Sequence, residues 1–113
     1  MHFGPRLEAV VPPCRTLADV GTDHAYLPVL LLQEGKIEQA IAGDVVPGPC
    51  EAARHTVRQF HLEERIAVRQ GSGLTVVAPG EVETAVMAGM GAETMLQILG
   101  EAPEVWQHPA FRH

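Results

Sequence analysis

The fold is decided by residues 17–28, which read LADVGTDHAYLP. Residues 17–20, apolar apart from Asp19, predict a short buried strand, and Gly21 allows the chain to turn sharply where that strand ends. Leu27–Leu32 then predicts an apolar helix behind the strand. A strand, a turn and a helix in this order form the kind of cradle in which nucleotide cofactors lie, although the loop lacks the G-x-G-x-x-G spacing of dinucleotide-binding folds.

A second apolar strand ends in an acid at the distance expected for a ribose contact. Residues 40–44 read AIAGD, so Asp44 follows Asp19 by about 25 positions, close to the ~20-residue interval between a nucleotide loop and its ribose-binding acid. A carboxylate there can accept hydrogen bonds from both ribose hydroxyls. The alternative is that Asp44 only caps the turn before Pro47, but an acid that closes an apolar strand favours the ribose role.

A third segment combines an apolar strand with a loop of small residues. Residues 84–91 read TAVMAGMG, and a loop of this composition lets a flat substrate press against bare backbone. Met87 is expected to fill the core, whereas Met90, between two glycines, is expected to line a pocket.

Five phrases follow one another along the chain: ADVGTDHAYLP (18–28), AIAGDVVPGP (40–49), VRQGSGL (68–74), PGEVET (79–84) and AGMG (88–91). Together they resemble the bacterial tRNA (adenine-22-N1)-methyltransferase family, over residues 6–99. The resemblance implies a class I methyltransferase, with a Rossmann-like sheet, that uses S-adenosylmethionine to methylate N1 of an adenine in tRNA. The family is longer, with further strands and a helical domain, so we expect this chain to correspond to the front part of such an enzyme.

The resemblance also implies a set of site residues. Residues implied to bind the cofactor are Asp19, Gly21, Thr22, Tyr26, Asp44, Ser72, Gly73, Ala88 and Gly89, and those implied to lie beside the reacting atoms are Asp23, His24 and Met90. The implied reaction is a direct displacement at an activated methyl group. Adenine N1 offers a free lone pair once it is unpaired, so no general base is required, and a loop without acidic or basic side chains fits that chemistry.

Several of these residues have simpler explanations. Asp19 lies inside an apolar strand and must be hydrogen-bonded, either to loop N–H groups or to the amino group of the cofactor. Thr22 or Asp23 is also explained as the N-cap of the following helix. His24 is explained as a packed or solvent-facing side chain, and Tyr26 as part of the core or of a pocket wall.

Ser72 is the point at which the sequence departs from the family pattern. The resemblance implies an Asp at this position, which accepts a hydrogen bond from the adenine amino group. A serine hydroxyl can also accept that bond, but it is shorter and uncharged. Charge-assisted hydrogen bonds are about twice as strong as neutral ones, so we expect reduced cofactor affinity.

Composition limits the class of protein. With 113 residues, 46% hydrophobic and 4% aromatic, the chain can bury one modest aliphatic core. A net charge of −6 is opposite to that of a free-standing RNA-binding domain, so most of an RNA-binding surface is expected outside this sequence. Cys14 and Cys50 lack metal-ligand spacing, and reduced thiols with no metal site are expected. The sequence shows no signal peptide, and its longest apolar run is too short to cross a membrane, so a cytoplasmic protein is expected.

The positions of Pro and Gly divide the chain into alternating strands and helices. Strands are expected over 16–20, 40–44, 66–70 and 84–88, helices over 6–11, 25–34, 49–61 and 92–99, and a brief helical turn over 74–77. This alternation predicts an α/β fold with a mostly parallel sheet in the order 3-2-1-4 and helices on both faces. Gly100 is expected to cap the last helix. Residues 1–102 are then an incomplete S-adenosylmethionine-binding domain, and 103–113 an irregular tail.

Two consequences are expected from this organisation. The fourth strand would be a bare edge, able to recruit another copy of the chain unless the tail covers it. Methyl transfer to tRNA by this chain alone would be weak. The alternative functions are a methyltransferase with another acceptor and a non-catalytic cofactor-binding fragment.

Overall fold

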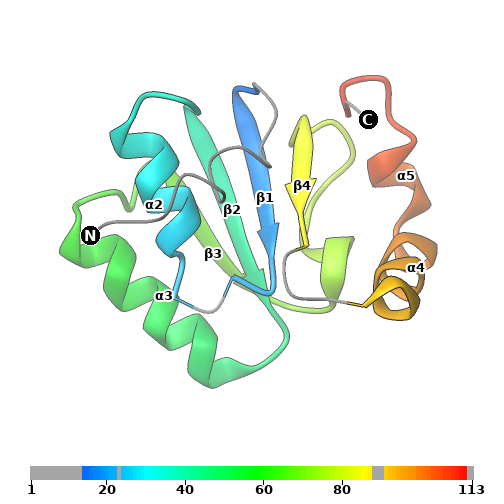
Figure 1. Cartoon of the computed structure of the whole chain (residues 1–113), viewed down its shortest axis with the longest axis horizontal. Helices are drawn as coiled ribbons and strands as arrows, with labels where there is room; N and C mark the ends of the chain where they lie inside the picture. Colours follow the sequence, from blue (N-terminus) through cyan, green and yellow to red (C-terminus); the bar gives the residue numbers. More distant parts are fainter. Residues whose placement is uncertain (1–13, 23, 88–90, 112–113) are drawn as a thin grey trace.

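The protein is an α/β domain built on one parallel sheet. The computed structural model describes residues 14–22, 24–87 and 91–111; the helix predicted over 6–11 lies outside them. The elements are β1 (Thr16–Val20), α2 (Tyr26–Gln33), β2 (Gln39–Asp44), α3 (Pro47–Gln59), β3 (Ile66–Gln70), the 3-10 turn η1 (Gly73–Val76), β4 (Thr84–Val86), α4 (Ala92–Glu101) and α5 (Pro103–Trp106). The sheet order is β3-β2-β1-β4, with all pairs parallel, so the predicted topology is confirmed (Figure 1).

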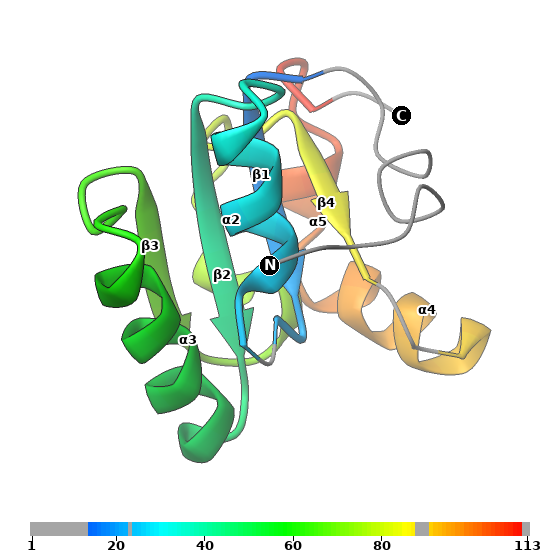
Figure 2. The same ribbon diagram turned by 60° about the vertical axis from the view of Figure 1, so that its left-hand side comes forward.

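The side chains of β1 alternate between the two faces of the sheet, and each face packs into its own hydrophobic core. Leu17 packs in a cluster with the apolar residues of α2 and α3, whereas Ala18 packs in a second cluster with residues of η1, α4 and α5. Successive side chains of a strand point to opposite faces, so this central strand contributes to both clusters. Helices therefore lie on both sides of the sheet, as Figure 2 shows.

The helices on the first face follow their sequence patterns closely. The buried face of α3 follows the helical period: Ala53 and Val57 are buried, and Phe60, directly after the helix, packs against the same cluster. Gly35 follows α2 with a φ of +73°, a conformation that favours glycine and ends the helix there. Helix α3 begins two residues before its predicted start, at Pro47, whose fixed φ suits the first turn.

The region after β4 differs from prediction. Helix α4 runs through Gly100 to Glu101, so Gly100 is an interior helical residue and not a cap. The expected irregular tail begins with the helix α5, in which Val105 is buried in the second cluster. Trp106 Nε1 donates a hydrogen bond of 2.8 Å to the Leu99 carbonyl, which ties α5 to α4. Pro at the first helical position was the signal for α5.

β4 lies at an edge of the sheet, as predicted. Within the described ranges it pairs only with β1, through Thr84, Ala85 and Val86. Position 88, the last residue of the predicted strand, lies outside those ranges. No helix in the described part of the chain is long and apolar enough to cross a bilayer.

The corrected end of α4 yields a stability test. Gly100 is exposed, and a Cβ added to it meets no atom within 4 Å. Gly100→Ala should therefore raise the free energy of unfolding by about 0.5–1 kcal/mol, the usual gain for Ala over Gly inside a helix. Urea denaturation measures the change.

The matched control for Gly100 is Gly35. Its Cβ position is equally open, but its φ is positive. Gly35→Ala should therefore lower the free energy of unfolding by about 1 kcal/mol because of backbone strain. Loss of stability in Gly100→Ala would mean that Gly100 has the conformation of a cap after all.

Candidate functional site

A cleft of about 230 Å³ opens at the carboxyl ends of β1, β2 and β3, against α4. In parallel α/β sheets this is the end at which ligands bind. The cleft is lined by residues from the three strand ends and from one helix: Val20, Gly21, Gly43, Asp44, Val45, Gly71, Ser72, Gly73, Thr94, Gln97, Ile98 and Glu101. It therefore gathers four predicted site residues: Gly21, Asp44, Ser72 and Gly73.

The loop after β1 is held against the end of β2. The N–H groups of Gly21 and Thr22 both donate to the Gly43 carbonyl, at 2.9 and 3.0 Å. Gly21 has a φ of +73°, which an L side chain rarely adopts. The turn predicted for Gly21 is therefore present, and it brings the loop to the strand that ends in Asp44.

Asp44 is half-buried at the end of β2, where two hydrogen bonds fix its position. Its Oδ1 accepts from the Val46 N–H at 3.1 Å, and its carbonyl accepts from the Gly71 N–H at 2.9 Å. The second bond ties the end of β2 to the loop after β3. The carboxylate is thus oriented by its own loop at the wall of the cleft.

The loop after β3 lies directly on α4. Gly73 has a φ of +52°, and a Cβ there would come within 2.7 Å of Ile98 Cγ2. Only a glycine allows the loop to come this close to Ile98. On the same loop, Ser72 Oγ donates to Glu101 Oε2 at 2.8 Å.

Asp19 does not line the cleft but lies buried beneath the loop after β1. Its Oδ2 accepts a hydrogen bond of 2.8 Å from the Thr22 hydroxyl, a side-chain donor rather than the loop N–H group or cofactor amino group that the sequence suggested. Desolvation by burial raises the pKa of Asp19 from 3.8 to about 6; the hydrogen bond from Thr22 opposes this shift and the negative charge of Asp44 adds to it. Thr22 is therefore a partner of Asp19, and the N-cap of α2 is Ala25, without a side-chain hydrogen bond.

His24 and Tyr26 are exposed on the segment that leads into α2. Their rings stack, with centroids 5.2 Å apart and planes inclined by 12°. Tyr26 is 43% exposed, so its assignment to the core is wrong, and neither ring lines the cleft. Asp23, Ala88, Gly89 and Met90 lie outside the described residues.

Sequence reasoning missed the wall that α4 contributes. Thr94, Gln97 and Glu101 lie at i, i+3 and i+7 of this helix and all line the cleft. The spacing of these three polar residues on one face of the helix was the signal in the sequence that could have predicted this wall. Glu101 was not predicted to belong to this helix, because Gly100 was expected to end it.

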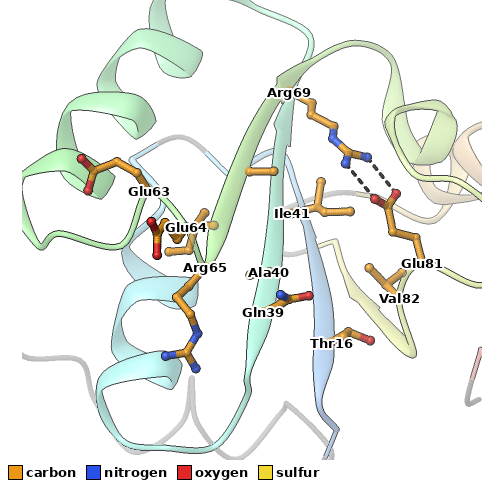
Figure 3. Close-up of a pocket in the computed structure, with 12 residues that line it drawn as sticks. Thr16, Gln39, Ala40, Ile41, Glu63, Glu64, Arg65, Arg69, Glu81 and Val82 are labelled. Carbon is orange, nitrogen blue, oxygen red and sulfur yellow. Dashed lines mark hydrogen bonds and ion pairs between the residues drawn. The ribbon is translucent and has the colours of Figure 1, made fainter.

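A second hollow lies near the amino ends of the strands (Figure 3). Arg69 and Glu81 face each other across it and form two hydrogen bonds, of 2.8 and 2.7 Å, and Arg69 also donates to the Val76 carbonyl. The bond from Arg69 is the main reason why the pKa of the Glu81 carboxyl is lowered. The two charged side chains pair with each other and fix the connection from β3 to β4. They are therefore less available to a ligand, and the hollow is a weaker candidate for a ligand site than the cleft.

The carboxyl-end cleft, with its glycine turn and its strand-terminal acid, defines an α/β domain of the nucleotide-cofactor-binding class. The sequence matches the methyltransferase domain family over residues 4–111. It is 40% identical over 102 residues to the tRNA (adenine(22)-N(1))-methyltransferase of Bacillus subtilis (strain 168), covering 88% of this chain and 43% of that protein. The chain belongs to the methyltransferase domain family, and the predicted resemblance is confirmed.

Solved structures give the same result. Streptococcus pneumoniae Sp1610, in complex with S-adenosyl-L-methionine, superposes with a TM-score of 0.85 at 38% identity, covering 93% of this chain and 51% of that one. TrmK of M. capricolum, in complex with S-adenosyl-homocysteine, gives 0.81 at 30% identity, covering 96% and 49%. The Rossmann-like fold class is confirmed, and the chain spans about half the length of the relatives it matches.

Among the described residues, no group of three or more His, Cys, Asp or Glu side chains is arranged to hold a metal ion.

The buried Asp19 makes stability depend on pH in a defined direction. An acid whose pKa is raised to about 6 holds its proton more tightly in the folded state. Its ionisation therefore opposes folding, so its contribution to the free energy of unfolding should fall as pH rises from about 4 through about 6, by at most about 3 kcal/mol.

Asp19→Asn removes this titration and keeps an oxygen to accept the Thr22 hydrogen bond. The difference in free energy of unfolding between the variant and the original chain should grow in favour of the variant from pH 4 to pH 8. Urea denaturation at several pH values tests this, with the exposed Glu64→Gln as control. Parallel curves for Asp19→Asn and the original chain would exclude a raised pKa.

Proposed function

We propose that this chain is the S-adenosylmethionine-binding part of a methyltransferase that acts on N1 of an adenine in tRNA. The observation that carries the proposal is the cleft that gathers Gly21, Asp44 and Ser72 at the carboxyl ends of three strands. Relatives that match most of this chain were solved with S-adenosyl-L-methionine and with S-adenosyl-homocysteine.

The residues of the cleft suit the chemistry of this cofactor. The Asp44 carboxylate suits two ribose hydroxyls, both of which are donors. Val20 and Ile98 provide apolar walls for a purine, and Val45 is exposed directly after the acid. The Ser72 hydroxyl provides lone pairs for the adenine amino group. Gly21 forms the turn that places the loop after β1 at the cleft, and Gly73 allows the loop after β3 to lie against α4, which supports their predicted role.

When bound, S-adenosylmethionine would supply a methyl group already activated by a sulfonium. The protein then has to orient the acceptor and exclude water. We assign that role to the segments that follow β1 and β4, and propose Asp23, His24 and Met90 beside the acceptor, with Ala88 and Gly89 toward the cofactor. The exposed stack of His24 and Tyr26 supports this assignment, because aromatic faces stack with unpaired bases.

In this proposal, Asp19 and Thr22 support the cleft without contacting the cofactor. Their hydrogen bond ties the loop that carries Gly21 to β1, and both side chains are buried. We propose that they set the shape of the loop rather than contact the ribose or the purine.

Recognition of tRNA belongs to the whole protein in this proposal. The net charge of −6 opposes binding to a phosphate backbone, so we assign most of the RNA-binding surface to sequence outside this chain. A cytoplasmic location follows from a tRNA substrate. The same acidic charge favours a second candidate, a cofactor-binding domain that acts on another acceptor; base mapping after methylation of tRNA separates the two.

Asp44 provides the direct test of the cofactor cleft. Asp44→Ala removes the proposed acceptor of two ribose hydrogen bonds and should weaken binding of S-adenosyl-homocysteine by at least about tenfold. Titration calorimetry measures the affinity. Glu64→Ala, which removes an exposed acid from the opposite end of the sheet, should bind as the original chain does. Equal affinities for all three proteins would remove the ribose assignment.

The edge of β4 provides a test of self-association, which we also propose. An edge strand offers N–H and C=O groups to another chain. Within the described ranges β4 pairs only with β1, and Thr84–Val86 carries no charge to discourage pairing. We expect light scattering to show a mass that rises with concentration, and amide hydrogen exchange in β4 to slow over the same range. A constant monomeric mass together with robust methylation of tRNA would contradict both the edge and the partial-enzyme proposals.

A further inference from the structure

The feature that suggests a further role is the contact between Ser72 and Glu101. Their side chains come from segments 29 residues apart in sequence, and Ser72 Oγ lies 2.8 Å from Glu101 Oε2. Both residues line the same cleft as Asp44. The contact therefore adds a carboxylate to the part of the wall where the resemblance implies an acid and the sequence has a serine.

The geometry determines where the serine proton points. A hydroxyl has one proton and two lone pairs, whereas a carboxylate only accepts hydrogen bonds. Ser72 must therefore donate its proton to Glu101. Toward the cleft, Ser72 presents lone pairs only, although an unconstrained serine can either donate or accept.

The position of Glu101 is set by the packing around the last turn of α4. Gly73 places the loop against Ile98, one turn before Glu101 on the same helix. On the far side, Ala102 is buried, and Trp106 is hydrogen-bonded to the Leu99 carbonyl. The end of the helix is thus anchored on both sides of the acid.

We propose that Glu101 makes the cleft selective for a purine that carries an amino group at C6 over one that carries a carbonyl there. The inference rests on the proposed function, in which the cleft holds the adenosine part of the cofactor. A base joined to a ribose at Asp44 lies in the same cleft, whose remaining walls include Ser72, Ile98 and Glu101. The amino group of adenine donates to Ser72, whereas a carbonyl oxygen at C6 would face a Ser72 lone pair and the negative charge of Glu101.

Glu101 acts through Ser72 and is a positioning residue. Without the acid, the Ser72 hydroxyl can rotate and donate to a carbonyl. The preference for an amino group should then decrease even where the affinity for the adenine ligand changes little. A purely structural role for Glu101 would instead change the affinity for both ligands equally.

The experiment compares two ligands in titration calorimetry: S-adenosyl-homocysteine and its deaminated form, S-inosyl-homocysteine. The original chain should prefer the first by at least about tenfold, the value expected for one satisfied hydrogen bond against one unpaired acceptor. Glu101→Ala should narrow this preference to within about threefold. Glu104→Ala, which removes an exposed acid on α5 that does not line the cleft, should leave the preference unchanged.

Ser72→Ala keeps the test informative, because it removes the hydroxyl that Glu101 orients. The preference for S-adenosyl-homocysteine over S-inosyl-homocysteine should decrease in Ser72→Ala. The double variant Ser72→Ala, Glu101→Ala should show the same preference as Ser72→Ala alone. If Glu101→Ala binds S-adenosyl-homocysteine normally and keeps the full preference for it over S-inosyl-homocysteine, the proposed role of Glu101 is wrong. The proposed function would then still stand. Failure of the original chain to bind either ligand would overturn both.

Discussion

The carbonyl of Gly43 is the constraint on which the site depends. It accepts two N–H groups from the loop after β1, at 2.9 and 3.0 Å, and so joins the ends of the two central strands at one atom. The residue that supplies it must be small, since a Cβ would come within 3.0 Å of a Val76 methyl group. The glycine turn, the acid of the next residue and the loop after β3 therefore meet around this group.

The order of the sheet and most of its elements were predictable because local signals agreed with tertiary packing. β1 and β3 have their predicted bounds, since each is a short segment with a majority of apolar residues and is followed by a glycine. The buried face of α3 agrees with the spacing of Ala53 and Val57, which lie four residues apart. The end of α4 was predicted wrongly because a glycine near the end of a helix is more often a cap than an interior residue. The packing of Ala102 and Val105 extends the structure beyond Gly100.

The site was predictable only where its residues are fixed by strand ends. Gly21, Asp44, Ser72 and Gly73 meet in the cleft because parallel strands deliver their carboxyl ends to one edge. The partners of these residues were not predictable. The bond of Ser72 to Glu101 depends on how α4 lies against the loop, and a one-dimensional pattern carries no information on that contact.

The pairing of β1 with β4 also determines when the fold can be completed. Next to β1, the Arg15 N–H donates to Glu83 Oε1, a contact between groups 68 positions apart, and the Glu83 N–H returns a bond to the Thr16 hydroxyl. Closing a loop of this length requires a large loss of chain entropy before the contacts can compensate for it. On the ribosome, the strands β1, β2 and β3 can associate early, but the second core remains open until the chain beyond β4 has emerged from the exit tunnel.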